Sequence, residues 1–154
     1  MTACIDIQQA CEDPCPDPEQ IRHWVKQALA GKPAEVSLRI VDEAEMTALN
    51  QRYRGKAGPT NVLSFPFAPP PGVPNTFLGD IVICAPVVAM EAHEQGKSLS
   101  AHWAHMVVHG ILHLQGYDHI DPKEAQHMEQ LETEILARLG FDNPYQEEVL
   151  THHE

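Results

Sequence analysis

The chain has 154 residues, 43% hydrophobic and 21% charged, a balance typical of one globular domain that can bury a core, here residues 1–154. The formal net charge of −12 argues against a general nucleic-acid coat protein, because nucleic acids are polyanions. Residues 118–154 carry ten of the 22 acidic residues and two of the ten basic ones, so a polyanion contact should lie elsewhere.

We expect neither a signal peptide nor a membrane span in this chain. The N-terminal residues lack a basic region followed by an apolar one, and the longest apolar run, residues 81–90, is too short to cross a bilayer. We therefore expect a cytoplasmic protein with reduced thiols at Cys4, Cys11, Cys15 and Cys84. Cys11 and Cys15 could form half of a zinc site, but no second nearby pair completes it.

The chain begins with a strand, a helix and a second strand. Residues 2–8 and 35–42 alternate apolar and polar side chains, which predicts strands. Between them, residues 17–31 predict a helix with Asp17 as its N-cap and Gly31 at its end.

A second helix should follow Asp42, which with Glu45 resembles a capping box. Residues 61–67 predict a third strand that Pro66 either ends or places at a sheet edge. Residues 68–76 hold too many prolines for a helix and predict a connector.

The second half of the chain is mostly helical. A fourth strand over residues 78–84 precedes predicted helices over residues 87–96, 98–116 and 121–140. The helix 98–116 is apolar on most sides, which predicts a buried central position. The expected fold is α+β, a sheet of about four strands packed against this helix and flanking helices. The order of the strands cannot be read from the sequence.

Three histidines stand in the stretch "HGILHLQGYDH", residues 109–119. His109 and His113 are four residues apart on the predicted helix, so their side chains lie on one face and can converge on one ion. Gly116 allows the chain to turn and bring His119 back as a third ligand. Three imidazoles leave a zinc ion an open position for water, as in catalytic sites.

Other residues near these histidines limit the chemistry. His102 and His105 fall on the same helical stripe, and we expect them to line the cleft or to support the ligands. Zinc peptidases place a general-base glutamate directly after the first helical histidine, but Gly110 stands there. This argues against a peptidase and leaves metal-activated hydrolysis possible.

These motifs are similar to those of the YbeY family of bacterial metal-dependent endoribonucleases. "HGILHLQGYDH" resembles the family's histidine signature, "LNQRYRGKAGPTNVLSFPF" its second conserved block and "LGDIVI" a third. Residues 131–145 extend the resemblance towards the C-terminus. Many members have aspartate where this chain has Asn61, which weakens any role for a carboxylate at that position.

The resemblance implies one Zn²⁺ ion held by His109, His113 and His119 with a water, and a catalytic role for Arg54. It also implies single-strand-specific cleavage of RNA in 16S rRNA 3′-end maturation and ribosome quality control. A small-subunit ribosomal protein and a ribosome-associated GTPase are the partners it suggests. Arg54 would hold the scissile phosphate, with Arg52 and Lys56 as auxiliary contacts; otherwise Arg54 is a solvated charge at a helix end.

Several points remain open from the residues alone. A zinc hydrolase of another class, such as a peptidase, and a non-enzymatic ribosome assembly factor with a structural metal are the alternative functions. Nickel, copper or iron could replace zinc. No general base is assigned, and either Asp80 or Asp118 could orient a ligand histidine through its second ring nitrogen.

Overall fold

The computed structural model describes residues 4–67, 69, 71–72, 77–117, 122–141 and 144. The strands are β1 (Cys4–Gln9), β2 (Glu35–Val41), β3 (Val62–Pro66) and β4 (Phe77–Cys84). The helices are α1 (Pro18–Leu29), α2 (Glu43–Arg54), α3 (Ala85–Gln95), α4 (Leu99–Leu114) and α5 (Pro122–Arg138). The predicted α+β fold is confirmed. None of the described helices is long and apolar enough to cross a membrane.

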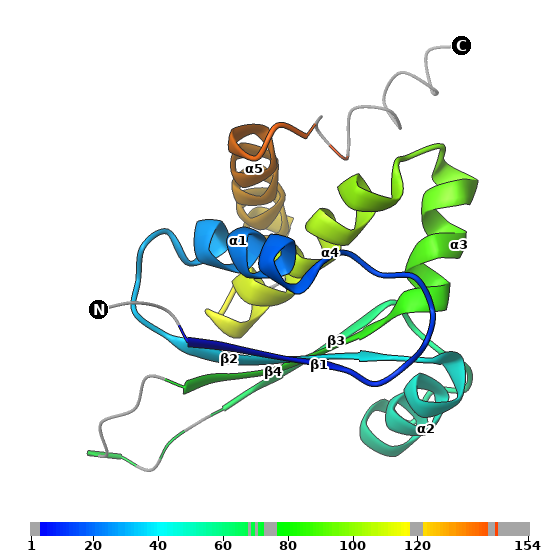
Figure 1. Cartoon of the computed structure of the whole chain (residues 1–154). Helices are drawn as coiled ribbons and strands as arrows, with labels where there is room; N and C mark the ends of the chain where they lie inside the picture. Colours follow the sequence, from blue (N-terminus) through cyan, green and yellow to red (C-terminus); the bar gives the residue numbers. More distant parts are fainter. Residues whose placement is uncertain are drawn as a thin grey trace.

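The four strands form one mixed sheet in the order β1-β2-β4-β3. β1, β2 and β4 are parallel, and β3 runs antiparallel to β4 at the edge. Pro66 is the last residue of this edge strand, where its missing N–H faces away from β4 and interrupts no ladder hydrogen bond. In Figure 1, α1, α4 and α5 lie on one side of the sheet and α2 lies on the other.

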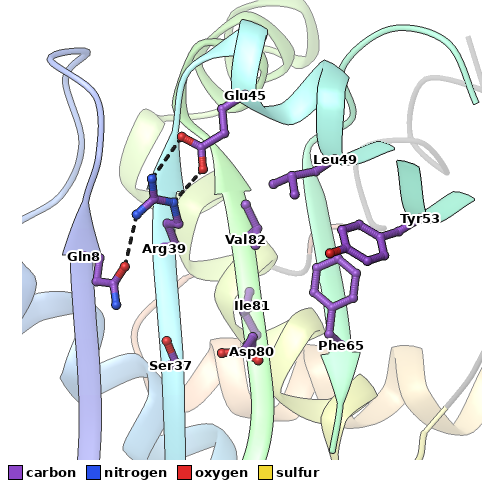
Figure 2. Close-up of a pocket in the computed structure, with 10 residues that line it drawn as sticks. All are labelled: Gln8, Ser37, Arg39, Glu45, Leu49, Tyr53, Phe65, Asp80, Ile81 and Val82. Carbon is purple, nitrogen blue, oxygen red and sulfur yellow. Dashed lines mark hydrogen bonds and ion pairs between the residues drawn. The ribbon is translucent and has the colours of Figure 1, made fainter. Parts of the chain in front are cut away.

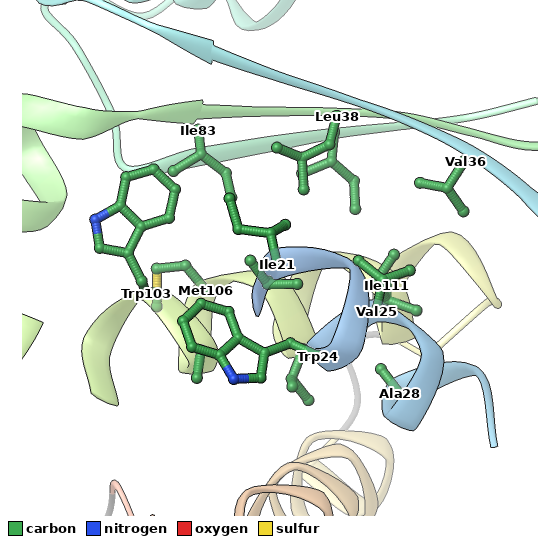
Figure 3. Packing of buried hydrophobic residues seen from close by; sticks show 14 of the residues in the cluster. Ile21, Trp24, Val25, Ala28, Val36, Leu38, Ile83, Trp103, Met106 and Ile111 are labelled. Carbon is green, nitrogen blue, oxygen red and sulfur yellow. The ribbon is translucent and has the colours of Figure 1, made fainter. Parts of the chain in front are cut away.

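Helix α4 lies at the centre of the core, as its apolar sequence predicts. Trp103, Met106 and Ile111 of α4 pack in one cluster with the sheet residues Leu38 and Ile83 (Figure 3). Apolar side chains of α1 complete this cluster, and all of its members are nearly inaccessible to water. Burial at roughly 25 cal/mol per Å² of apolar surface makes this face the main source of stability.

The caps of helices α1 and α2 agree with the predictions from the sequence, with two differences. Asp17 and Asp42 cap α1 and α2 by accepting hydrogen bonds from backbone N–H groups. The capping box at α2 is only half formed, because the Glu45 carboxylate binds Arg39. Helix α1 ends one residue earlier than predicted, because Ala30 already adopts a left-handed conformation, with φ of 53°.

Gly110 brings α4 close to the sheet. A Cβ atom at this position would lie 3.1 Å from Cδ1 and 3.2 Å from Cγ2 of Ile81 on β4. Position 110 therefore faces the core, and a glutamate there could not reach solvent. The absence of a peptidase-type glutamate thus has a packing reason in this fold.

We predict that Gly110→Ala lowers the free energy of unfolding by about 1 kcal/mol, measured by urea denaturation. Overpacking costs about 1–3 kcal/mol, and the better helix propensity of alanine offsets roughly 0.5–1 kcal/mol of this cost. Adding Ile81→Val removes the nearest clashing atom, so the double variant should lose less stability than the sum of the two single variants. Additive losses would show that Ile81 does not limit position 110.

Candidate active-site cleft

A cleft of about 350 Å³ lies between the end of α2, strand β3 and helix α4. Its lining is mostly polar and consists of Arg54, Thr60, Asn61, Val62, Leu63, Ser64, His109 and His113. The fold thus brings the predicted arginine and two of the three predicted histidines into one cavity, although α2 and α4 are far apart in the sequence. His119, the third predicted ligand, and Asp118 lie outside the described residues.

His109 and His113 form the helical side of this cleft. They are one turn apart on α4, and their ring centroids are 6.2 Å apart with the ring planes at 80°. Both are half-buried, while nearly all their neighbours on α4 are buried. The mostly buried helix α4 is therefore accessible from the cleft at these two imidazoles.

Glu132 of α5 holds His109 and its neighbour His105 from behind the cleft. The Glu132 side chain is fully buried. One carboxylate oxygen lies 3.2 Å from Nδ1 of His109, and the other lies 2.8 Å from Nε2 of His105. A carboxylate can only accept hydrogen bonds, so both ring nitrogens must carry the donated proton. In neutral His109 the lone pair is then on Nε2, the form in which imidazole binds a metal.

Glu132 is ionised although its side chain is buried. Burial alone would raise the pKa of this carboxyl, but the hydrogen bonds from His105 and His109 outweigh it and lower the pKa from 4.5 to about 2. Burial also lowers the pKa of His105 below 6.5, in spite of the opposing contact with Glu132. Both effects favour an ionised glutamate beside a neutral His105 near pH 7.

Glu132 was not predicted as part of the site, although the sequence carries a signal for it. Glu132 lies on the inner face of α5 with Met128, Ile135 and Leu136. An acidic residue on a buried apolar face needs a partner, because an unpaired buried charge is strongly unfavourable. The histidine stripe of α4 supplies that partner.

Asp80 does not orient His109 or His113, the two predicted ligands that the structure describes, contrary to one of our expectations. Neighbouring residues of a strand point to opposite faces, and Ile81 packs against α4, so Asp80 points away from it. Figure 2 shows Asp80 on the other face of the sheet, in a cavity of about 510 Å³ beside the ion pair of Arg39 with Glu45. This face carries α2 and is separated from the histidines by the sheet.

A second carboxylate links α3 to α4 and to β3. Glu91 of α3 lies 2.9 Å from Nε2 of His102 and accepts bonds of 3.1 and 3.3 Å from the Asn61 amide. Burial alone would raise the pKa of Glu91, but these partners lower it. His102 thus binds the half-buried Glu91 and His105 binds the fully buried Glu132. Neither histidine is among the described residues that line the cleft.

The charges at the end of α2 are not equivalent. Arg54 is exposed, lines the cleft, and forms no ion pair with any described residue. The Arg52 guanidinium lies 5.5 Å from the Tyr53 ring centroid. Neither Arg52 nor Lys56 is among the described lining residues, so the geometry separates Arg54 from the two expected auxiliary contacts.

Two described residues of the cleft, His109 and His113, are suitable ligands for a zinc-like metal. Imidazole nitrogens are suitable ligands, and the Glu132 contact fixes His109 in the appropriate tautomer. Within the described ranges, which omit His119, no group of three histidine, cysteine, aspartate or glutamate side chains could hold a metal ion. A three-ligand site therefore depends on His119.

Comparisons with known proteins assign the chain to one family. A family model described as Endoribonuclease YbeY matches residues 6–140. The chain is 60% identical to Endoribonuclease YbeY of Methylococcus capsulatus over 143 residues, which cover 93% of this chain and 95% of the relative. It is 54% identical to Endoribonuclease YbeY of Alteromonas mediterranea over 154 residues, with coverage of 94% and 98%.

The fold is also similar to that of a Thermotoga maritima protein known from a solution structure. The TM-score is 0.60 at 27% sequence identity, and the match covers 86% of each chain. The fold and the cleft define a small α+β protein whose histidine helix packs on a mixed sheet. The chain belongs to the Endoribonuclease YbeY family. This membership supports the role of an enzyme that acts on RNA.

We predict that the metal-free protein loses stability as the pH falls. The unfolded chain protonates His105 near pH 6.5, before the folded protein does, so stability is full above this pH and declines below it. The Glu132 contribution is full above pH 4.5 and is lost as the pH falls towards about 2. Urea unfolding between pH 7.5 and 3.5 measures both.

The control variant for this pH dependence is Glu132→Gln, which keeps the shape of the side chain and removes its titration. Its stability should depend less on pH below 4.5 than that of the wild type. A wild-type protein that becomes more stable as the pH falls from 7.5 to 5 would contradict the assignment of neutral His105.

Proposed function

We propose that this protein is a single-strand-specific endoribonuclease that cleaves phosphodiester bonds in ribosomal RNA processing, including 16S rRNA 3′-end maturation and ribosome quality control. The proposed cofactor is one Zn²⁺ ion held by His109, His113 and His119 with a water. The main supporting observation is that Arg54 lines the same polar cleft as His109 and His113. Family membership supports the RNA-cleaving activity.

The local charge of the cleft suits a phosphate in spite of the net charge of −12. Its described lining includes Arg54 but no aspartate or glutamate. The electrostatic potential in the cleft depends mainly on charges within about 10 Å, because salt screens charges that lie farther away. A single-stranded RNA backbone can therefore enter this cavity, while the acidic remainder of the protein limits unspecific binding.

Each residue of the cleft has a separate role in the proposed reaction. Arg54 would hold two oxygens of the scissile phosphate and stabilise the charge that develops in the transition state. His109, oriented by Glu132, and His113 would present ring nitrogens to the metal. When bound, zinc would supply Lewis acidity for activating a water or polarising a phosphate oxygen. Gly110 contributes no base, because glycine has no side chain.

Delivery to the substrate by protein partners is a further part of the proposal. A cleft with one described arginine gives few phosphate contacts, and affinity for nucleic acid grows with their number. A small-subunit ribosomal protein and a ribosome-associated GTPase would bring this enzyme to the precursor in the cytoplasm. The exposed Glu124 and Glu134 of α5 are suitable contacts for a basic partner.

We predict that Arg54→Ala reduces cleavage of single-stranded RNA by about 100- to 1000-fold, because one donor to the transition state is lost. The variant should keep its zinc and its stability, within about 0.5 kcal/mol, since Arg54 is exposed. Single-turnover cleavage, elemental analysis and urea unfolding measure the three properties.

Arg52→Ala is the matched control, because it removes the same charge from the same helix outside the described cleft lining. Equal losses in both variants would show that Arg54 contributes only general charge. If Arg54→Ala cleaves normally, its assigned role is wrong. A wild-type protein that cuts casein but not RNA would favour a peptidase, and one that cuts neither would favour an assembly factor.

We also predict that Glu132→Gln weakens zinc binding by about 10- to 100-fold, because the proton donor of His109 loses its charged acceptor. Competition with a chromophoric chelator measures the affinity. Glu91→Gln is the control, since Glu91 binds His102 and not His109. Equal effects of the two substitutions would contradict the specific role of Glu132.

A further inference from the structure

The open edge of β3 runs along the candidate active site. β3 is the last strand of the sheet, and among the described strands it pairs with β4 alone. Its residues Val62 and Ser64 line the cleft together with Arg54 and His113. The backbone of an edge strand presents N–H and C=O groups that a ligand can use.

The register shows which backbone groups point outward. Asn61 O accepts a hydrogen bond from Cys84 N, and Phe67 N donates one to Leu78 O. Hydrogen-bonded pairs alternate along an antiparallel ladder, so the odd-numbered residues of this strand bond to β4. The backbone groups of Val62 and Ser64 therefore point away from β4.

Among the described residues, one outward N–H of β3 remains available for a ligand. The N–H of Val62 donates to the side-chain oxygen of Asn61 at 2.7 Å. Pro66 has no N–H. The remaining outward donor is the N–H of Ser64, and the carbonyl of Val62 is the outward acceptor next to it.

The residue that occupies the Val62 N–H is itself held firmly. The amide of Asn61 donates to both oxygens of Glu91, and Glu91 binds the buried His102. Asn61 is thus fixed by α3 and α4, and the N–H of Val62 stays occupied. An additional β-strand would need a continuous row of donors and acceptors, which this edge does not offer.

We propose that the Val62 carbonyl and the Ser64 N–H bind the pairing edge of one unpaired RNA base, next to the phosphate held by Arg54; this inference rests on the proposed function. Adenine, guanine, cytosine and uracil each carry a donor beside an acceptor on that edge, so the edge of β3 accepts any base. A base inside a duplex already uses these groups. The contact therefore selects single strands without selecting a sequence.

The test uses a single-stranded RNA oligonucleotide in which each nucleotide in turn is abasic. Wild-type protein with zinc should cleave and bind one of these RNAs about tenfold less well, because two hydrogen bonds are lost. The abasic position should flank the cleaved bond. A flat profile over all positions, in both cleavage and binding, would overturn the inference.

Two variants of Ser64 test the backbone donor. Ser64→Ala and Ser64→Pro both lose the hydroxyl, but only the proline variant loses the N–H, at an edge position that tolerates proline. Ser64→Pro should cleave intact RNA about threefold more slowly than Ser64→Ala and be less sensitive to the abasic position, because only the Val62 carbonyl remains to bind the base. Equal rates and equal sensitivity of the two variants would overturn the inference.

The remaining outcomes separate this inference from the proposed function. If Ser64→Pro does not unfold cooperatively, the wild-type abasic profile decides. If wild-type protein cleaves no RNA but binds it with a dip at one abasic position, the proposed activity fails and the base contact stands. If it cleaves RNA with a flat profile, the activity stands and the base contact fails.

Discussion

The buried carboxylate of Glu132 is the interaction on which the histidine helix depends. It accepts hydrogen bonds from His105 and His109 at the centre of the interface between α4 and α5. An ionised group without water is stable only when charged or polar partners surround it, and here two imidazoles take that role. The same contact joins the two helices and determines which nitrogen of His109 carries the lone pair.

The two faces of the sheet have different surroundings. One face packs under α4, where Gly110 permits close approach to Ile81 and brings the histidines to the level of the edge strand. The other face carries α2 and the cavity with Arg39 and Asp80. The cleft forms where the end of α2 reaches past β3, so Arg54 and the histidines approach from different sides of the sheet edge.

Much of the fold could be predicted because its signals are local. Alternation, helical periodicity and the caps at Asp17 and Asp42 placed the strands and helices within a few residues. Strand order depends on contacts between distant segments and could not be read. Pro66 was informative because proline in a sheet is confined to positions such as an edge, where its missing N–H interrupts no ladder hydrogen bond.

The sequence proposed residues for the site but not their supports. His109 and His113 were proposed from their spacing and Arg54 from the family resemblance, and the structure places these three in one cleft. Glu132 was missed because α5 is rich in acidic residues, most of which are solvated. Asp80 was considered as a support for the histidines, but the alternation of β4 places it on the opposite face, because its neighbour Ile81 faces α4.

A crystal structure of the zinc-loaded protein with a non-cleavable single-stranded RNA is the most direct measurement. The account predicts one ion bound to Nε2 of His109, to His113 and to His119, with an RNA phosphate between this ion and the guanidinium of Arg54. An ion bound elsewhere, or a phosphate that does not contact Arg54, would contradict it.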